Sequence, residues 1–583
     1  MSVPMGPTKV DDGYTFRVWA PNARTVAVIG EFNGWFGDAN HLESQGDGTW
    51  SGTLSGARTW QEYKYRIGTD EGPLDRIDPY ARQVTNSVGN GILTDPGGFD
   101  WQGDSFRCPS AGELVIYELH IGTFTPEGTF DAAVTRLDHL VGLGVNAIEV
   151  MPIAEFAGDD SWGYNPAHPF AVESVYGGPD QFRHLVRECH KRGIAVILDV
   201  VYNHFGPSDL QLWRFDGWSQ NGKGGIYFYE DDRSATPWGD TRPDYGRAEV
   251  RQYITDNALM WVQECHVDGL RLDMTAYIRS LDGFGAEEIP DGWSLMRELN
   301  DAVHGIRPDA LTIAEDMRDD HRLTAWDDAG AAFSAQWDGS FVRVLRSTMQ
   351  QADDASRSIG AICGLLTAGG DAPFARVLFT ESHDAVANGH ERMPPEISPT
   401  EPTGWLAQKK STVAAGIALT APGIPMIFEG QEFLTGGWFQ DTVGLDWSLA
   451  DTFAGTVAFY RDLIRLRRNW DNDTRGLSGE GYQVTHCDEG AKVLAMHRWF
   501  DGGPGDDVVV VANLGGDEVW GQRIGFPAAG PWRCKVNSDS PHYGPFAGKG
   551  SGDLEAVESP ADGQPASAEL GLGPYSVMVF ARA

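Results

Sequence analysis

The sequence predicts an α/β protein: a (β/α)8 (TIM) barrel flanked by N-terminal and C-terminal all-β sandwich domains. Three observations predict this architecture. The chain has 583 residues, which is too many for a single hydrophobic core. Short apolar runs alternate with helical stretches from about residue 112 to about 475. Alternating, turn-rich segments precede and follow that region, so we expect domains at 1–105, 106–480 and 481–583.

Eight short apolar runs are expected to form the strands of the barrel. They are 115–120, 147–152, 195–201, 268–273, 311–315, 332–337, 377–381 and 425–429. The run at 195–201 is almost continuously apolar, which is typical of a parallel strand buried on both faces. Stretches with helical spacing lie between the runs, at 130–143, 179–192 and 250–264. An open doubly wound sheet is the rival fold, but no GxGxxG or GxxxxGK motif follows any strand.

The sequence patterns of the two flanking regions are typical of β-sandwiches. Residues 14–20 and 25–29 alternate apolar and polar side chains, with turn-forming residues between the runs. Beyond residue 480 the same alternation returns at 492–499, 508–512 and 576–580. A long segment within the barrel region, 203–247, is rich in Gly, Trp and Tyr, as is typical of a loop that shapes a substrate site.

The charge and composition of the chain indicate which kinds of molecule it can bind. The chain has 45 basic and 83 acidic side chains, and its formal net charge is −38. A surface this acidic repels phosphate backbones and anionic lipids, so we expect neither nucleic acid nor membrane surfaces as partners. A neutral substrate is not disfavoured. The 20 Trp residues exceed what cores need and offer flat faces for sugar rings, although ordinary packing is the simpler explanation.

Cysteine spacing and the N-terminal segment bear on the compartment. The six cysteines are far apart and form no CxxC pair, so we expect buried free thiols in a reducing compartment. Residues 1–6 do not combine a basic start with an apolar run, and no apolar run is long enough to span a bilayer. We expect a soluble, cytoplasmic monomer or small homo-oligomer. No dedicated cluster of metal ligands stands out, so neither a metal nor another cofactor is expected.

The segment 268–273 carries the first chemical signal. Arg271 and Asp273 alternate with Leu270 and Leu272, so on a strand the two charged residues share one face. A guanidinium beside a carboxylate favours the ionised acid, which suits a nucleophile. Taken alone, the pair has an equally good explanation as a structural ion pair at a strand end.

Other polar residues follow neighbouring expected strands. They are Asp199, Asn203, His204, Glu315, His383 and Asp384. Because parallel barrel strands end at one rim, we expect these residues to converge there with the pair at 271 and 273. Each alone could be a buried hydrogen-bonding or ion-pairing residue, but gathered carboxylates destabilise a protein unless function retains them. Paired carboxylates are what cleavage of a glycoside needs, and no GxSxG or HExxH motif competes.

Four segments containing these residues, 199–204, 269–273, 314–316 and 382–384, resemble the ordered signature regions of the α-amylase superfamily, glycoside hydrolase family 13. The resemblance implies a retaining mechanism on an α-1,4-glucan such as glycogen, amylose or maltooligosaccharides. It also implies roles for individual residues. Asp273 is implied as the nucleophile, Glu315 as the general acid/base and Asp384 as the carboxylate that holds sugar hydroxyls. Arg271 is implied to support Asp273, and Asp199 to be a structural aspartate. His204 and His383 are implied to bind the sugar, and Tyr164 to stack beneath it. Trp162, beside Tyr164, and Trp238 complete the expected substrate-binding residues.

The resemblance leaves the reaction open. Segments 18–23 and 31–35 are similar to the starch-binding-like module of branching, debranching and trehalose-releasing members. Branching activity is favoured by 382–386 and 430–433. Trehalohydrolase activity on maltooligosyltrehalose is second, because 118–128 resembles its first strand, and plain α-amylase or debranching hydrolysis is third. A catalytically inactive glucan-binding protein is the non-enzymatic alternative, although retention of all three carboxylates disfavours it.

Overall fold

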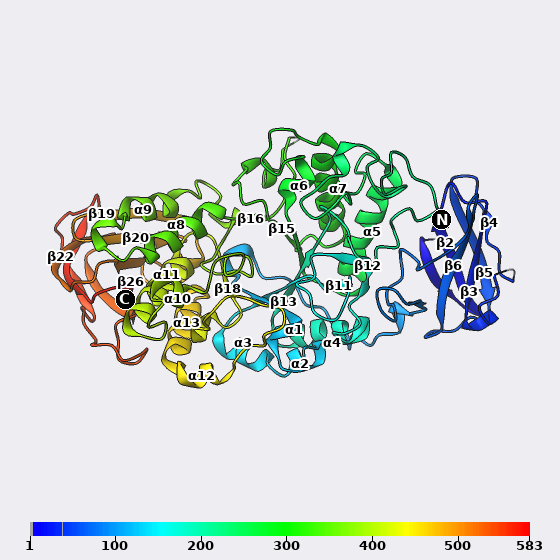
Figure 1. Ribbon diagram of the computed structural model, residues 1–583. Coiled ribbons are helices and arrows are strands. Elements are labelled where there is room, and N and C mark those ends of the chain that lie inside the picture. The colour runs from blue at the N-terminus through cyan, green and yellow to red at the C-terminus, as the bar shows by residue number, and fades with distance from the viewer. Residues whose placement is uncertain (1–3, 38, 328, 583) are drawn as a thin grey trace.

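The computed structural model describes residues 4–37, 39–327 and 329–582. An N-terminal β module, a central α/β barrel and a C-terminal β domain lie in a row, with the barrel in the middle (Figure 1). Residues 1–3, which belong to the segment where no leader is expected, lie outside the described residues. Among the described helices, none combines the length and the apolar character that crossing a bilayer requires.

The barrel closes from eight parallel strands, which confirms the predicted fold class. The strands are β9 (Ile116–Leu119), β10 (Ala147–Val150), β13 (Ala195–Val200), β14 (Gly269–Leu272), β15 (Leu311–Ala314), β16 (Ala335–Trp337), β17 (Arg376–Leu378) and β18 (Ile424–Phe428). They pair in chain order around the barrel, and β18 pairs with β9 to close it. β16 starts three residues later than expected because Ala332 adopts a left-handed conformation, φ 58°, that interrupts the extended run.

Helices surround the barrel. They are α1 (Ile121–Phe124), α2 (Phe130–Val134), α3 (Leu137–Leu143), α4 (Gly178–Lys191), α5 (Ala248–Glu264), α6 (Thr275–Arg279), α7 (Pro290–Ile306), α8 (Gly339–Gln350), α9 (Ile359–Thr367), α10 (Met393–Ile397), α11 (Trp405–Thr420), α12 (Ser448–Thr452) and α13 (Ala454–Arg467). The helix expected over 130–143 divides in two. The N–H groups of Thr135 and Arg136 donate to carbonyls three residues back, so the α-helical spacing is lost between α2 and α3.

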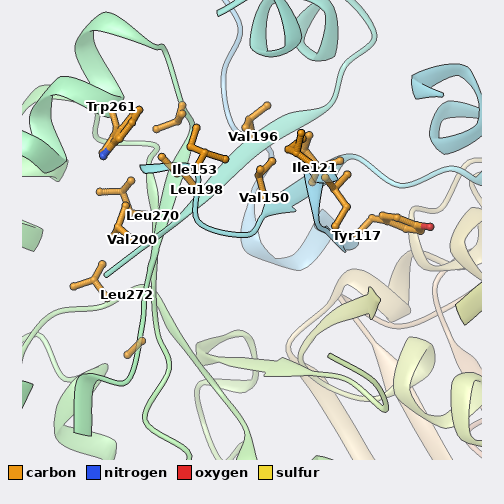
Figure 2. Packing of buried hydrophobic residues seen from close by; sticks show 14 of the residues in the cluster. Tyr117, Ile121, Val150, Ile153, Val196, Leu198, Val200, Trp261, Leu270 and Leu272 are labelled. Atoms are coloured by element: carbon orange, nitrogen blue, oxygen red, sulfur yellow. The ribbon is translucent and has the colours of Figure 1, made fainter. Parts of the chain in front are cut away.

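Strand alternation gives the barrel two separate cores. Ile197 of β13 faces the interior, where it packs with Ile116 and Ile313. The alternate residues Leu198 and Leu270 face outward, where they pack under the helices. Figure 2 shows this outer layer on β9, β10, β13 and β14, with Trp261 of α5 beside it. The same alternation turns residues 118, 149, 199 and 271 toward the barrel axis.

The N-terminal module consists of two antiparallel sheets packed face to face. Its strands are β1 (Gly6–Val10), β2 (Gly13–Trp19), β3 (Thr25–Gly30), β4 (Glu43–Ser44), β5 (Thr49–Ser55), β6 (Glu62–Thr69), β7 (Gly72–Arg76) and β8 (Gly91–Ile92). One sheet has the order β1-β2-β5-β4, and the other is built from β3, β6 and β7 with β8 on β6. Phe16 of the first sheet packs edge-on against Tyr63 and Tyr65 of the second, at 5.5 and 6.4 Å between ring centroids.

The C-terminal domain is also antiparallel. Its strands are β19 (Gly481–Asp488), β20 (Val493–Trp499), β21 (Val508–Asn513), β22 (Val519–Phe526), β23 (Gly530–Asn537), β24 (Leu554–Ala556), β25 (Ala566–Leu572) and β26 (Ser576–Arg582). Six of them form one sheet, and β22 pairs with β25 in a second; Phe526 of the small sheet packs against Phe580 of the large one. A further hairpin, β11 (Ala154–Phe156) with β12 (Pro166–Val172), belongs to the barrel region.

The cysteines are free, as expected, but not all of them are buried. Cys189 and Cys265 are fully buried, and Cys108, Cys363 and Cys534 are partly buried. The expectation of a buried thiol is wrong for Cys487. Its side chain is exposed on β19, a strand with no fully buried residue, and it interacts there with the side chain of Cys363.

The N-terminal module holds the long loop 201–247, which joins β13 to α5. Both the backbone N–H and the side-chain amide of Asn22 donate to Oδ2 of Asp216 in that loop, each at 2.9 Å. Arg76 donates to two carbonyls of the loop at 3.1 Å, and Trp19 packs edge-on against Tyr227. A cavity of about 710 Å³ opens beside this contact, between the module and α5, and none of the expected site residues lines it. The loop is therefore anchored from outside the barrel.

Asp216→Ala is expected to loosen this anchor. The Asp216 carboxylate is buried and accepts hydrogen bonds from Asn22 and from the N–H of Trp218, so its removal leaves buried donors unpaired. We expect a loss of about 1–3 kcal/mol, visible as a lower Tm and faster proteolysis within the loop. Asp240→Ala is the matched control, because that side chain is 48% exposed and its carboxylate pairs with Lys223 at the surface. Equal Tm values for the two variants would contradict the anchor.

Candidate active site

The site is built around one buried guanidinium. Arg271, near the end of β14, is fully buried and directs Nη1 to Oδ2 of Asp199 at 2.7 Å and to Oδ1 of Asp273 at 3.1 Å. Its Nη2 lies 3.2 Å from Oε2 of Glu315. The guanidinium also lies over the ring of Trp337, 4.3 Å from its centroid. Three carboxylates from β13, β14 and the end of β15 therefore share a single cation.

Asp199 shares Nη1 of Arg271 with Asp273. Its Oδ2 also accepts a hydrogen bond from the hydroxyl of Tyr164 at 2.5 Å. Burial raises the pKa of Asp199 to about 6, although Arg271 and Tyr164 both favour its ionised form. Both contacts are made by Oδ2, which thereby links Arg271 to the Tyr164 ring, whereas Oδ1 is buried without a hydrogen-bond partner among the described residues.

Asp273 is buried and held by an amide as well as by the guanidinium. The side-chain amide of Asn203 donates to Oδ2 of Asp273 at 2.6 Å and to its backbone carbonyl at 2.8 Å. Burial raises the pKa of Asp273 to about 6; Arg271 and Asn203 oppose the shift, and the charges of Asp199 and Asp384 add to it. The carboxylate is thus ionised near neutral pH, as a nucleophile must be.

Glu315 lies directly after β15 and differs from Asp273 in its surroundings. Its Oε2 accepts the backbone N–H of Met274 at 2.7 Å. Met274 has φ 39°, a left-handed conformation that is costly for a non-glycine residue and that turns this N–H toward the acid. Burial and the charges of Asp273 and Asp384 raise the pKa of Glu315 to about 8 against the opposing effect of Arg271. This acid is the one that retains a proton near neutral pH.

Asp384, after β17, is bound to a buried histidine. Oδ2 of Asp384 lies 3.5 Å from Nε2 of His383, and the side chain of Asp384 is 42% exposed. Burial opposes ionisation of Asp384, but the adjacent His383 outweighs it and lowers the pKa. On its other side, Nδ1 of His383 lies 2.5 Å from Oε1 of Glu118, a residue of β9. Asp384 therefore stands as an anion at the open edge of the cluster.

Aromatic rings form two walls of the site. The rings of Tyr164 and His383 stack with centroids 5.1 Å apart, and Trp162 meets His383 edge-on at 5.7 Å. Trp238, from the anchored loop, stacks on His204 at 4.6 Å with the planes 10° apart. Flat rings in this arrangement suit the apolar faces of sugars.

His204 is buried and neutral. Asn203 gives its amide N–H to Asp273, so its Oδ1 accepts a hydrogen bond from Nδ1 of His204. Burial lowers the pKa of His204 to about 3, which keeps the ring neutral. Nε2 is buried without a hydrogen-bond partner of good geometry among the described residues, and the backbone of Tyr164 is the polar group that acts on the ring. A ligand hydroxyl is the donor that fits this position.

The structure brings the nine expected site residues into one contiguous group. Direct contacts link Asp273, Glu315, Arg271, Tyr164, His383, Asp384 and Trp162, and Asn203 joins His204 and Trp238 to them. Three contributors had no predicted role: Glu118, the N–H of Met274 and Trp337. Strand alternation could have indicated Glu118, because a carboxylate on the inner face of β9 must point at the barrel axis. No sequence signal indicates the Met274 conformation.

The C-terminal rim of this parallel barrel carries carboxyl groups whose pKa values differ. This arrangement is typical of barrel enzymes that catalyse reactions with a pair of acidic residues. Models of known protein families match nearly the whole chain. Residues 4–81 match carbohydrate-binding module 48 (isoamylase N-terminal domain), and 484–583 match the alpha amylase C-terminal all-beta domain. Residues 80–214 and 211–483 match the alpha amylase catalytic domain. The chain belongs to the alpha-amylase family, glycoside hydrolase family 13.

Named relatives and solved structures agree with that membership. A 1,4-alpha-glucan branching enzyme GlgB from Rhodospirillum rubrum is 33% identical over 97% of this chain and 80% of its own length. A protein of the same name from Corynebacterium jeikeium is 30% identical over 99% of this chain and 83% of its own length. The structure of a Bacillus subtilis type I pullulanase complexed with maltose aligns with a TM-score of 0.77 at 20% identity, covering 100% of this chain and 86% of that one. The pullulanase shares the fold.

The separated acids predict a bell-shaped pH dependence of kcat/KM for glucan turnover. If Asp273 is the nucleophile, it must be ionised, and activity falls as the pH drops below its pKa of about 6. If Glu315 is the proton donor, activity falls as the pH rises above its pKa of about 8. Initial rates at low substrate across pH 4–10 measure both limbs. A profile that is flat on both sides would contradict this pair.

Proposed function

We propose that this chain is a 1,4-α-glucan branching enzyme, which cleaves an α-1,4 link and transfers the released chain to a 6-hydroxyl. The observation that carries the proposal is the similarity, across nearly the whole chain, to relatives named as branching enzymes. The cluster of Asp273, Glu315 and Asp384 around Arg271 supports a double displacement, because one guanidinium keeps the first two acids close together.

The first displacement forms a glycosyl-enzyme ester. An oxygen of Asp273 attacks the anomeric carbon, the bond from that carbon to the glycosidic oxygen breaks, and Glu315 gives its proton to the departing 4-hydroxyl. The N–H of Met274 and the guanidinium of Arg271 both touch Glu315, so they hold its carboxyl beside the bond that breaks.

The second displacement transfers the chain. Glu315, now ionised, removes the proton of an acceptor 6-hydroxyl, whose oxygen attacks the anomeric carbon. The ester bond breaks, and Asp273 leaves as a carboxylate stabilised by Arg271 and Asn203. Water in place of the sugar hydroxyl would give hydrolysis by the same steps. The difference between a branching enzyme and an amylase therefore lies in the acceptor.

The remaining residues bind the substrate in this proposal. Asp384 accepts hydrogen bonds from sugar hydroxyls, and His204 accepts one at Nε2. Tyr164 stacks beneath the reacting sugar, and Trp162 and Trp238 contact its neighbours. The substrate is an α-1,4-glucan such as glycogen, amylose or maltooligosaccharides. The N-terminal module is proposed to hold a second part of the same glucan.

Asp273→Asn and Glu315→Gln should each remove most turnover. The first keeps the shape of the nucleophile but removes its negative charge, and the second abolishes proton transfer. We expect kcat to fall by at least about 10³-fold in each, with glucan binding retained. Glu429→Gln is the matched control, because the carboxylate of this buried strand-end residue accepts hydrogen bonds only from His120 and Thr123 among the described residues, and the variant should keep most activity. Near-wild-type turnover in either active-site variant would contradict the catalytic role assigned to that residue.

Analysis of the reaction products tests which acceptor, a sugar 6-hydroxyl or water, receives the glucan chain. Proton NMR of products from amylose should show new α-1,6 signals with little increase in reducing ends. A large rise in reducing ends without new linkages would instead identify a hydrolase of the amylase or debranching type. Free trehalose from maltooligosyltrehalose would identify a trehalohydrolase, which segment 118–128 favours. Glucan binding without any turnover would leave a binding protein.

A further inference from the structure

A row of three charged groups runs from inside the barrel to its open rim. Glu118 on β9 is buried, His383 after β17 is buried, and Asp384 is partly exposed. Oε1 of Glu118 lies 2.5 Å from Nδ1 of His383, and Nε2 of His383 lies 3.5 Å from Oδ2 of Asp384. The histidine therefore stands between two carboxylates, and only the outer one reaches the substrate side.

Glu118 holds His383 with both of its oxygens. Besides the contact from Oε1 to the ring, Oε2 accepts the backbone N–H of His383 at 3.2 Å. The ring is further confined by Tyr164, stacked at 5.1 Å, and by Trp337, at 6.0 Å between centroids. A side chain gripped at the backbone and at one ring nitrogen has a fixed direction for the other nitrogen, which is Nε2 toward Asp384.

The charges around His383 favour its protonated form. Burial works against protonation, but Asp384 and Glu118 outweigh it and raise the pKa of His383 well above its ordinary value. Other charged or titratable groups that interact with the ring are Glu149 on β10, Asp199 on β13 and His120 after β9.

These further groups add little net charge. Burial and the charge of Glu118 raise the pKa of Glu149 well above its usual range, which favours its neutral form, and neither of its oxygens has a hydrogen-bond partner among the described residues. Burial lowers the pKa of His120 to about 4, which keeps it neutral as well. Asp199 is offset by its contact with Arg271. Glu118 and Asp384 are therefore the anions that decide the state of His383.

We propose that Glu118 is a positioning residue for the reaction: it keeps His383 protonated and oriented so that Nε2–H faces Asp384 and the sugar that Asp384 binds. Its effect on turnover rests on the proposed function, whereas its effect on His383 does not. Without the anion of Glu118, the ring loses its proton more readily, and Nδ1–H then bonds to residue 118. Nε2 would present a lone pair to the Asp384 carboxylate, which would repel it and release its orientation.

Glu118→Gln tests this through the shape of the pH profile. The amide oxygen can still accept from Nδ1–H, but the negative charge is gone. We expect the alkaline limb of kcat/KM to begin at lower pH than in the wild type, with the loss growing by up to about tenfold per pH unit above the new pKa of His383. Glu118→Asp keeps the charge and should keep the position of the limb, with lower activity at every pH. A loss in Glu118→Gln that is the same at every pH, or no loss, would overturn the proposal.

Glu432→Gln is the matched control. It changes another Glu–His pair, in which buried Glu432 lies 2.8 Å from the partly exposed His139, on the outer side of β9 and away from Asp384. The alkaline limb should stay in place in this variant. If it moves as it does in Glu118→Gln, the shift does not come from His383, and the proposal fails.

A second measurement does not depend on turnover. In protein labelled with ¹³C-histidine, the ring signal of His383 is identified by its loss in His383→Gln. It should titrate well above pH 6.5 in the wild type and at a lower pH in Glu118→Gln than in the wild type. A wild-type signal that titrates near 6.5 would overturn the role of Glu118. A wild type without turnover would overturn the proposed function, and the NMR result would still decide the protonation of His383.

Discussion

The structure of the site depends on one buried cation. Arg271 contacts Asp199, Asp273 and Glu315 with its two terminal nitrogens, and it has no solvent exposure. Three carboxylates this close would repel one another strongly in a medium of low dielectric, and a buried charge that loses its partner is strongly destabilising. The cluster therefore exists only because the guanidinium is central, flat and held over Trp337. Arg suits this place better than Lys, since its fork engages several acids at once.

The two acids nearest Arg271 differ because their second contacts differ. Asp273 accepts from the amide of Asn203, which favours its ionised form. Glu315 accepts one backbone N–H and faces the charges of Asp273 and Asp384, so it keeps its proton to higher pH. One acid suited to attack and one suited to donate thus arise from neighbouring strand ends. The row from Glu118 through His383 to Asp384 extends the same principle to a third carboxylate, which an imidazolium keeps ionised.

The flanking domains connect to this chemistry through the loop 201–247. The loop begins beside the cluster, carries His204 and Trp238, and is bound from outside by Asn22 and Arg76 of the N-terminal module. A segment of this length would be mobile if it were attached only at its ends. The module therefore does more than extend the molecule, because it restrains the segment that supplies one wall of the site.

The sequence by itself determined the barrel, and it indicated most of the residues that meet at its rim. Apolar runs alternating with helical stretches require a parallel sheet, and alternation along 268–273 requires Arg271 and Asp273 to share a face. Because parallel barrel strands end at one rim, His204, Glu315 and Asp384 could be expected together before their positions were known. These properties follow from local periodicity and from chain order, which a sequence displays directly.

Only the tertiary structure decided how these residues act on one another. Glu118 and His383 are 265 positions apart and meet only when the barrel closes between β17, β18 and β9. The pKa separation of the acids depends on burial, and the N–H aimed at Glu315 depends on a left-handed Met274 that no propensity predicts. Such features arise from distance and desolvation in three dimensions, whereas a sequence displays neighbours along the chain alone.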